Sequence, residues 1–123
     1  LLLDQYRRYM PTCMGIEVNG VGLPVIQILR NSGVPVMELN ATKDKVTKAI
    51  PIGARYESHK VFHRMGAAWL GDYEDELVGF PMGAHDDQVD TASYAAILTQ
   101  ELASRRTGAS LVELDVPNII SPV

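Results

Sequence analysis

The sequence predicts an α/β domain built on parallel strands, and three observations favour this class. Hydrophobic residues make up 46% of the chain and charged residues 21%, a balance typical of folded rather than disordered proteins. Two short apolar segments, at 13–18 and 34–39, flank a helical pattern at 21–31. This strand–helix–strand order predicts adjacent parallel strands joined by a right-handed crossover. A length of 123 residues suits one domain, or most of one, with a buried core.

The composition excludes several other classes of protein. A formal net charge of −4 argues against a uniformly basic nucleic-acid-binding surface. Cys13 is the single cysteine, so an intramolecular disulfide is excluded and a reducing compartment is expected. No apolar segment reaches the roughly 20 residues of a membrane-spanning helix, and the charges that follow Leu1–Leu3 argue against a signal peptide. We therefore expect a soluble intracellular protein.

The first elements follow from local patterns. Residues 1–9 are predicted to form a helix that ends before Pro11. The segment 13–18 is predicted to be a buried strand that carries one carboxylate, Glu17, and ends at the turn signal Asn19-Gly20.

The next helix and strand complete the predicted parallel unit. The 21–31 helix is expected to bury Val25, Ile28 and Leu29 on one face. A second strand then follows at 34–39.

Charge is unevenly distributed over the rest of the chain. Residues 40–67 carry six basic residues against two acidic ones, and residues 68–90 carry seven acidic residues and no Lys or Arg. Within the basic part, a short helix is predicted around 49–57 and an extended segment at 60–63.

The clearest helix is predicted at 86–104, and the residues after it, 107–123, are predicted to be a tail because Gly and Pro interrupt them. Small and apolar residues recur at helical spacing on one face of this helix: Ala92, Ala95, Ala96, Leu98 and Leu102.

The segment His85-Asp86-Asp87-Gln88-Val89-Asp90, at the start of this helix, is the strongest candidate for chemistry. Acidic residues are common at helix N-termini, where they cap free N–H groups, and Asp86 is well placed to do so. Three aspartates exceed what capping requires, and their mutual repulsion favours a bound cation. Mg²⁺ typically binds one or two carboxylates and keeps several water ligands, at positions where the substrate can bind. Asp87 and Asp90 are three residues apart and are expected to share a face.

Glu17 is the second candidate. A carboxylate between apolar neighbours is costly to bury unpaired, so it either faces solvent or lines a ligand site. Ligand sites in open α/β sheets lie at the carboxyl ends of strands. Together with the aspartates, Glu17 would suit two-metal phosphodiester hydrolysis, in which ions about 4 Å apart hold the attacking and leaving oxygens. The basic segment 40–67 is then either a solvated face or the place where DNA phosphates lie.

Other signals are weaker. Residues 19–22 hold two glycines of a dinucleotide-binding fingerprint, but Val25 stands at the third position. No Walker A sequence occurs in the chain. With one cysteine, His59 and His63 are unconvincing zinc ligands, and Trp69 is expected in the core rather than as a base-stacking platform.

Three segments, taken in order, resemble a known family: Ile16-Glu17-Val18-Asn19-Gly20-Val21-Gly22, Thr42-Lys43-Asp44-Lys45, and Leu77 to Asp90 (LVGFPMGAHDDQVD). The family is the C-terminal nuclease domain of tailed-phage terminase large subunits, and the resemblance covers residues 2 to 100. It implies an RNase H-like (RuvC-type) fold over residues 1–106. It also implies an endonuclease that cuts concatemeric double-stranded DNA during genome packaging with two divalent ions, Mg²⁺ or Mn²⁺.

The resemblance also implies roles for single residues and for partners. Glu17 matches the family's second acidic ligand, and the last acidic ligands lie within Asp86, Asp87 and Asp90, of which Asp87 and Asp90 are preferred. Expected partners are double-stranded DNA, the portal and the small terminase subunit, in the cytoplasm of the bacterial host and not at a membrane. Three lysines are expected to contact the DNA backbone: Lys43, Lys45 and Lys48.

One element of the family pattern has no counterpart. The family's first catalytic aspartate lies on the opening strand of a three-stranded meander, and nothing before the first helix of this sequence matches it. We therefore expect a fold without its first strands, with self-association through the exposed sheet edge. Two alternatives stay open: a catalytically incomplete DNA-binding or assembly module of the packaging motor, and another RNase H-like nuclease such as a junction resolvase.

Overall fold

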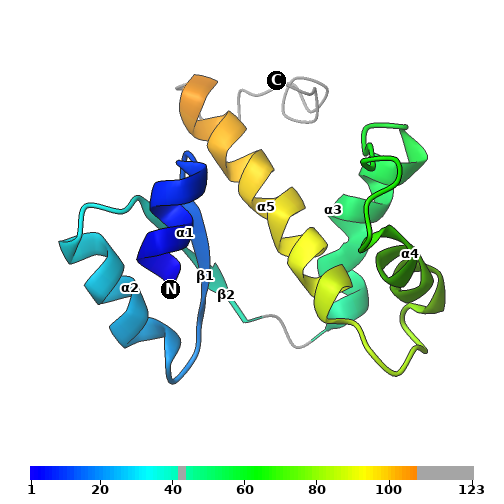
Figure 1. Ribbon diagram of the computed structural model, residues 1–123, viewed down its shortest axis with the longest axis horizontal. Helices are drawn as coiled ribbons and strands as arrows, with labels where there is room; N and C mark the ends of the chain where they lie inside the picture. Colours follow the sequence, from blue (N-terminus) through cyan, green and yellow to red (C-terminus); the bar gives the residue numbers. More distant parts are fainter. Residues whose placement is uncertain (42–43, 108–123) are drawn as a thin grey trace. The chain divides into compact units, whose positions relative to one another are not determined.

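Figure 1 shows the computed structural model, which describes residues 1–41 and 44–107. Lys43 and residues 108–123, which make up nearly all of the predicted tail, lie outside the described residues. The chain forms two compact units, Leu1–Lys43 and Asp44–Val123. The first unit contains α1 (Leu2–Tyr9), β1 (Met14–Val18), α2 (Gly22–Asn31) and β2 (Val36–Asn40). The second contains α3 (Lys45–Glu57), α4 (Leu70–Gly79) and α5 (Asp87–Thr107).

The first unit confirms the predicted parallel pair. β1 and β2 are adjacent and parallel, with Met14 opposite Val36 at one end and Val18 opposite Asn40 at the other. The connecting helix α2 packs against both strands. β1 is half-buried along its whole length rather than fully buried.

Of the face predicted for α2, Leu29 is buried, Val25 is half-buried and Ile28 is exposed. Ile26 and Leu29 are buried, whereas Ile28 is 60% exposed. The reason lies at Gly22, where a Cβ atom would stand only 2.1 Å from the carbonyl oxygen of Glu17. This close approach turns the Gly22 face toward β1, and Ile28 lies about 240° further around the helix.

In the second unit, α3 and α5 pack side by side, and α4 packs against α5 (Figure 1). Of the face predicted for α5 only Ala96 is buried, and Ala95 is exposed. The buried face instead includes Val89 and Ser93. Ser93 can be fully buried because its hydroxyl donates to the Val89 carbonyl at 2.7 Å, a polar contact that an apolar pattern does not reveal.

The segment between α3 and α5 differs most from the prediction. α3 begins at Lys45, four residues before the predicted helix, because the Asp44 side chain caps it by accepting the Val46 N–H at 3.0 Å. Residues 60–63, which were predicted to be extended, form neither a helix nor a strand, and α4 was not predicted. Trp69 lies directly before α4 and is 51% exposed, not in the core. No described helix has the length and hydropathy needed to cross a membrane.

Candidate functional site

A carboxylate from another helix holds the start of α5. Glu76 Oε1 on α4 accepts the backbone N–H groups of Gln88, at 2.6 Å, and of Val89, at 3.0 Å. Glu76 Oε2 accepts the side-chain amide of Gln88 at 3.0 Å. Partial burial acts to raise the pKa of Glu76, but the hydrogen bonds from Val89 and Gln88 outweigh it and hold this pKa below its ordinary value. Glu76 therefore performs the capping role that the sequence suggested for Asp86.

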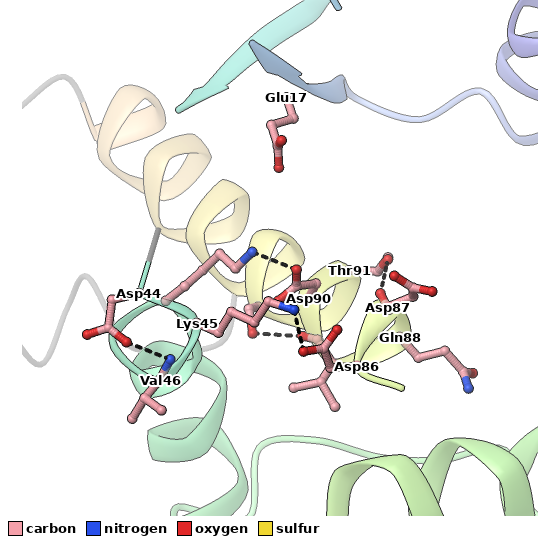
Figure 2. Close-up of polar contacts among 12 residues, drawn as sticks. Glu17, Asp44, Lys45, Val46, Asp86, Asp87, Gln88, Asp90 and Thr91 are labelled. Atoms are coloured by element: carbon pink, nitrogen blue, oxygen red, sulfur yellow. Dashed lines mark hydrogen bonds and ion pairs between the residues drawn. The ribbon is translucent and has the colours of Figure 1, made fainter. Parts of the chain in front are cut away.

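Asp86 faces α3 instead. Its Oδ2 lies 2.5 Å from Lys45 Nζ, and the two side chains are 25% and 51% exposed (Figure 2). The hydrogen bond to Asp86 raises the pKa of Lys45 and outweighs desolvation, which acts to lower it, and the charges of Asp86, Asp90 and Asp87 add to the rise. Lys45 is the first residue of α3, so this ion pair joins the starts of two helices.

A second ion pair lies one turn further along both helices. Lys48 Nζ is 2.9 Å from Asp90 Oδ2, and the Lys48 side chain is 3% exposed. The Lys48 ammonium also lies 4.4 Å from the centre of the Tyr94 ring, within the range of a cation–π contact.

The other carboxylate oxygen of Asp90 has no such contact. Asp90 Oδ1 is buried and has no hydrogen-bond partner among the described residues. An unpaired buried acceptor is costly, and a carboxylate oxygen is a preferred ligand of Mg²⁺ and Mn²⁺. Asp90 Oδ1 is therefore one oxygen at the start of α5 that could serve as a ligand.

Asp87 lies apart from this pair of carboxylates. It lines an open hollow between α4 and α5, together with Asp72, Asp75 and His85. Figure 2 shows the Asp87 carboxylate directed away from Lys45 and Asp86. The structure therefore brings Asp86 and Asp90 together on the α3 side of α5, whereas the sequence grouped Asp90 with Asp87.

Glu17 occupies the end of β1 in the first unit. Asn19 Nδ2 donates to Glu17 Oε1 at 3.3 Å, and Asn19 Oδ1 accepts the Gly22 N–H at 3.1 Å. Asn19 thus ties the carboxylate to the turn that begins α2. In the register of the two strands, Glu17 lies opposite Leu39 and on the same face of the strand pair. Leu39 is buried, at 7% exposed, so Glu17 has an apolar neighbour on this face.

Within residues 1–41 and 44–107, no three His, Cys, Asp or Glu side chains form a group that could hold a metal ion. Glu17 belongs to the first unit, and the cluster of Asp86, Asp87 and Asp90 belongs to the second.

A network that the sequence did not indicate surrounds His63. The Tyr56 hydroxyl lies 2.8 Å from His63 Nε2 and 3.0 Å from the Tyr73 hydroxyl. His63 Nδ1 lies 3.1 Å from Glu74 Oε1. Burial, together with the hydrogen bond to Tyr73, strongly raises the pKa of Tyr56. His63 therefore anchors the segment between α3 and α4, a structural role in place of the weakly indicated zinc site.

The first unit is a parallel strand–helix–strand unit with an acidic residue near the end of a strand, and the second unit contains a long helix that begins with aspartates. The family model described as the terminase RNaseH-like domain matches residues 2–98. The chain belongs to this terminase RNase H-like family, and the resemblance found in the sequence is confirmed. The described architecture is consistent with an RNase H-like fold. Searches of curated proteins and of solved structures give no significant match.

Proposed function

We propose that this chain is the nuclease part of a DNA-packaging terminase and that it hydrolyses phosphodiester bonds of double-stranded DNA with Mg²⁺ or Mn²⁺. The family match over residues 2–98 supports the nuclease class. The observation that carries the metal requirement is the buried Oδ1 of Asp90, which has no hydrogen-bond partner among the described residues.

The proposed ligands are Glu17 and carboxylates of the cluster at the start of α5, Asp86, Asp87 and Asp90. When bound, two divalent ions supply Lewis-acid stabilisation of the phosphate and an activated water. Lys48 Nζ forms an ion pair with Asp90 Oδ2, so the other oxygen, Oδ1, is available to a cation. Family resemblance and carboxylate chemistry support the inclusion of Glu17.

The basic residues take different parts in this proposal. Lys48 is 3% exposed and paired with Asp90, so we assign it to the interior of the site rather than to the DNA backbone. Lys45 is half-exposed and remains a candidate for contact with DNA. The same contact for Lys43 stays a prediction, since Lys43 lies outside the described residues.

Further partners belong to the proposal as well. A packaging nuclease would meet the portal and the small terminase subunit in the cytoplasm of a bacterial host. Self-association is also proposed, because each strand of the two-stranded sheet in the described residues has one edge without a strand partner.

A DNA-binding or assembly module without catalysis is the second candidate. The two ion pairs favour it, because Lys45 and Lys48 already neutralise Asp86 and Asp90 without any metal. No contact among the described residues specifically favours a junction resolvase.

Cleavage of linear double-stranded DNA by the full chain, with Mn²⁺ and with EDTA, separates the two candidates. A nuclease cleaves only with Mn²⁺ and loses activity in both Glu17→Gln and Asp90→Asn. Glu101→Gln is the matched control, because Glu101 is exposed further along α5. DNA binding without cleavage under any condition would instead identify an assembly module.

A further inference from the structure

Trp69 lines an open hollow between the start of α4 and α5. The hollow has a volume of about 330 Å³, and Tyr73, Thr91 and Ala92 also line it. The Trp69 ring meets the Tyr73 ring edge-on, with the ring centres 5.9 Å apart. Trp69 is nevertheless 51% exposed, so part of its indole is open to stacking against a planar group.

The wall of this hollow is held in place before any ligand arrives. The Tyr73 hydroxyl lies 3.0 Å from the Tyr56 hydroxyl, which in turn lies 2.8 Å from His63 Nε2. The His63 ring also packs edge-on against Tyr73. A wall that is already ordered loses little conformational freedom when a ligand binds.

A second hollow of about 330 Å³ adjoins the first, and the two share Tyr73, Ala92 and Ala95. The lining of the second hollow adds Arg55 of α3, which is half-buried. Within residues 1–41 and 44–107, the Arg55 guanidinium forms no ion pair. A guanidinium in such a position is well suited to a phosphate.

Charge distinguishes the two hollows. Gln88 separates the Trp69 hollow from a neighbouring one whose lining includes Asp72 and Asp75. These carboxylates repel a phosphate, whereas Arg55 attracts one. An anionic ligand with a planar ring is therefore oriented with its ring toward Trp69 and its charge toward Arg55.

Polar groups beside Trp69 suit the edge of a nucleobase. The Thr91 hydroxyl donates to the Asp87 carbonyl at 2.9 Å, and the Gln88 Nε2 group donates to Glu76 at 3.0 Å. The side-chain oxygen of each residue is thus left to accept a hydrogen bond from a base.

We propose that these two adjoining hollows bind single-stranded DNA, with an unpaired base against Trp69 and a backbone phosphate at Arg55. Bases within a duplex are already stacked and paired, so only an unpaired base offers its face. The inference rests on the proposed function only in taking DNA as the ligand, and it requires no metal ion.

Trp69 is the single tryptophan of the chain, so its fluorescence reports stacking directly. The full chain is titrated in EDTA with a short oligothymidylate, and EDTA excludes metal-dependent cleavage. Binding quenches the Trp69 fluorescence. A blunt duplex that contains the same strand quenches it far less.

Variants of Trp69 are compared through the fluorescence anisotropy of a labelled oligothymidylate. Trp69→Ala binds on the order of tenfold more weakly than the wild type. Trp69→Phe keeps a stacking ring and binds close to the wild type. Phe62→Ala is the matched control and also binds as the wild type does, because Phe62 is an aromatic residue, 88% exposed, that lines neither hollow.

The phosphate contact is tested through the dependence of binding on salt. Arg55→Gln lowers the slope of log affinity against log salt concentration by about 0.7, the value for one phosphate contact on a single strand. Arg55→Lys keeps the charge and the slope. Arg106→Gln is the matched control, since Arg106 is exposed in the last turn of α5, and its slope is that of the wild type.

The outcomes separate this inference from the proposed function. Unchanged Trp69 fluorescence in the presence of oligothymidylate, or unchanged binding by Trp69→Ala, overturns the stacking site. Equal quenching by the duplex overturns the requirement for an unpaired base. Quenching by an arginine-rich peptide and not by oligothymidylate assigns the hollows to a protein partner and also overturns the inference. Quenching by oligothymidylate without DNA cleavage by the wild type in Mn²⁺ supports the inference and overturns the nuclease.

Discussion

The carboxylate of Glu76 accepts the backbone N–H of Gln88 at 2.6 Å and so caps a helix to which it does not belong. This contact releases Asp86 from capping, and Asp86 pairs with Lys45 of α3 instead. The arrangement of the acidic cluster therefore depends on α4, an element without any proposed ligand.

Glu76→Ala should lower the melting temperature by several degrees, because the amides at the start of α5 lose their acceptor. The pKa of Glu76 is lowered from its ordinary value of 4.5 in the folded state. Its contribution to stability is therefore complete above that value and is lost as the pH falls through the lower folded-state pKa. Thermal melting of both proteins from pH 7 to pH 3 should show the difference shrink at the acid end.

Asp75→Ala is the control for this comparison, because Asp75 is an exposed carboxylate on the same helix. It should melt close to the wild type at every pH. A Glu76→Ala variant with unchanged melting at pH 7 would contradict the capping role.

Lys48→Met should destabilise the metal-free protein by about 3 kcal/mol, near the lower end of the range for buried pairs that lose one partner. The reason is that Asp90, at 27% exposure, would keep its charge without the ammonium group. Denaturant unfolding measures the change, with Lys45→Met as the comparison. Because Lys45 is half-exposed, its variant should lose far less stability, and equal losses would refute the distinction between the two lysines.

Gly22→Ala should destabilise the first unit by about 3 kcal/mol or more. The added Cβ would stand 2.1 Å from the carbonyl oxygen of Glu17, and the backbone must shift to admit it. Gly20→Ala is the matched control two residues earlier, since a Cβ there meets nothing within 4 Å. Denaturant unfolding that shows similar stability for the two variants would argue against this close approach.

Local patterns were sufficient for the parallel strands, because β-strand runs, the Asn19-Gly20 turn and helical spacing all lie within short windows. Local spacing also pointed to the aspartates at the start of α5. It could not say which of them lie together, because their partners are distant in sequence. Lys45 and Asp86 are separated by 41 positions and Glu76 and Gln88 by 12.

The helix faces were harder to predict than the helices. Ile28 fits an apolar stripe as well as Ile26 does, and the approach of Gly22 to the Glu17 carbonyl favours the burial of Ile26. Ser93 was missed for a similar reason, since its hydroxyl is satisfied within its own helix. Such choices depend on tertiary contacts that hydrophobic periodicity does not contain.

The central proposal is that the chain binds divalent ions through Glu17 and carboxylates of the cluster at the start of α5. Calorimetric Mn²⁺ titration of the full chain tests it most directly, with the wild type compared against Glu17→Gln and Asp90→Asn. We predict that the wild type binds Mn²⁺ and that each substitution alone abolishes or greatly weakens this binding. Mn²⁺ binding that is unchanged in both variants would contradict the claim.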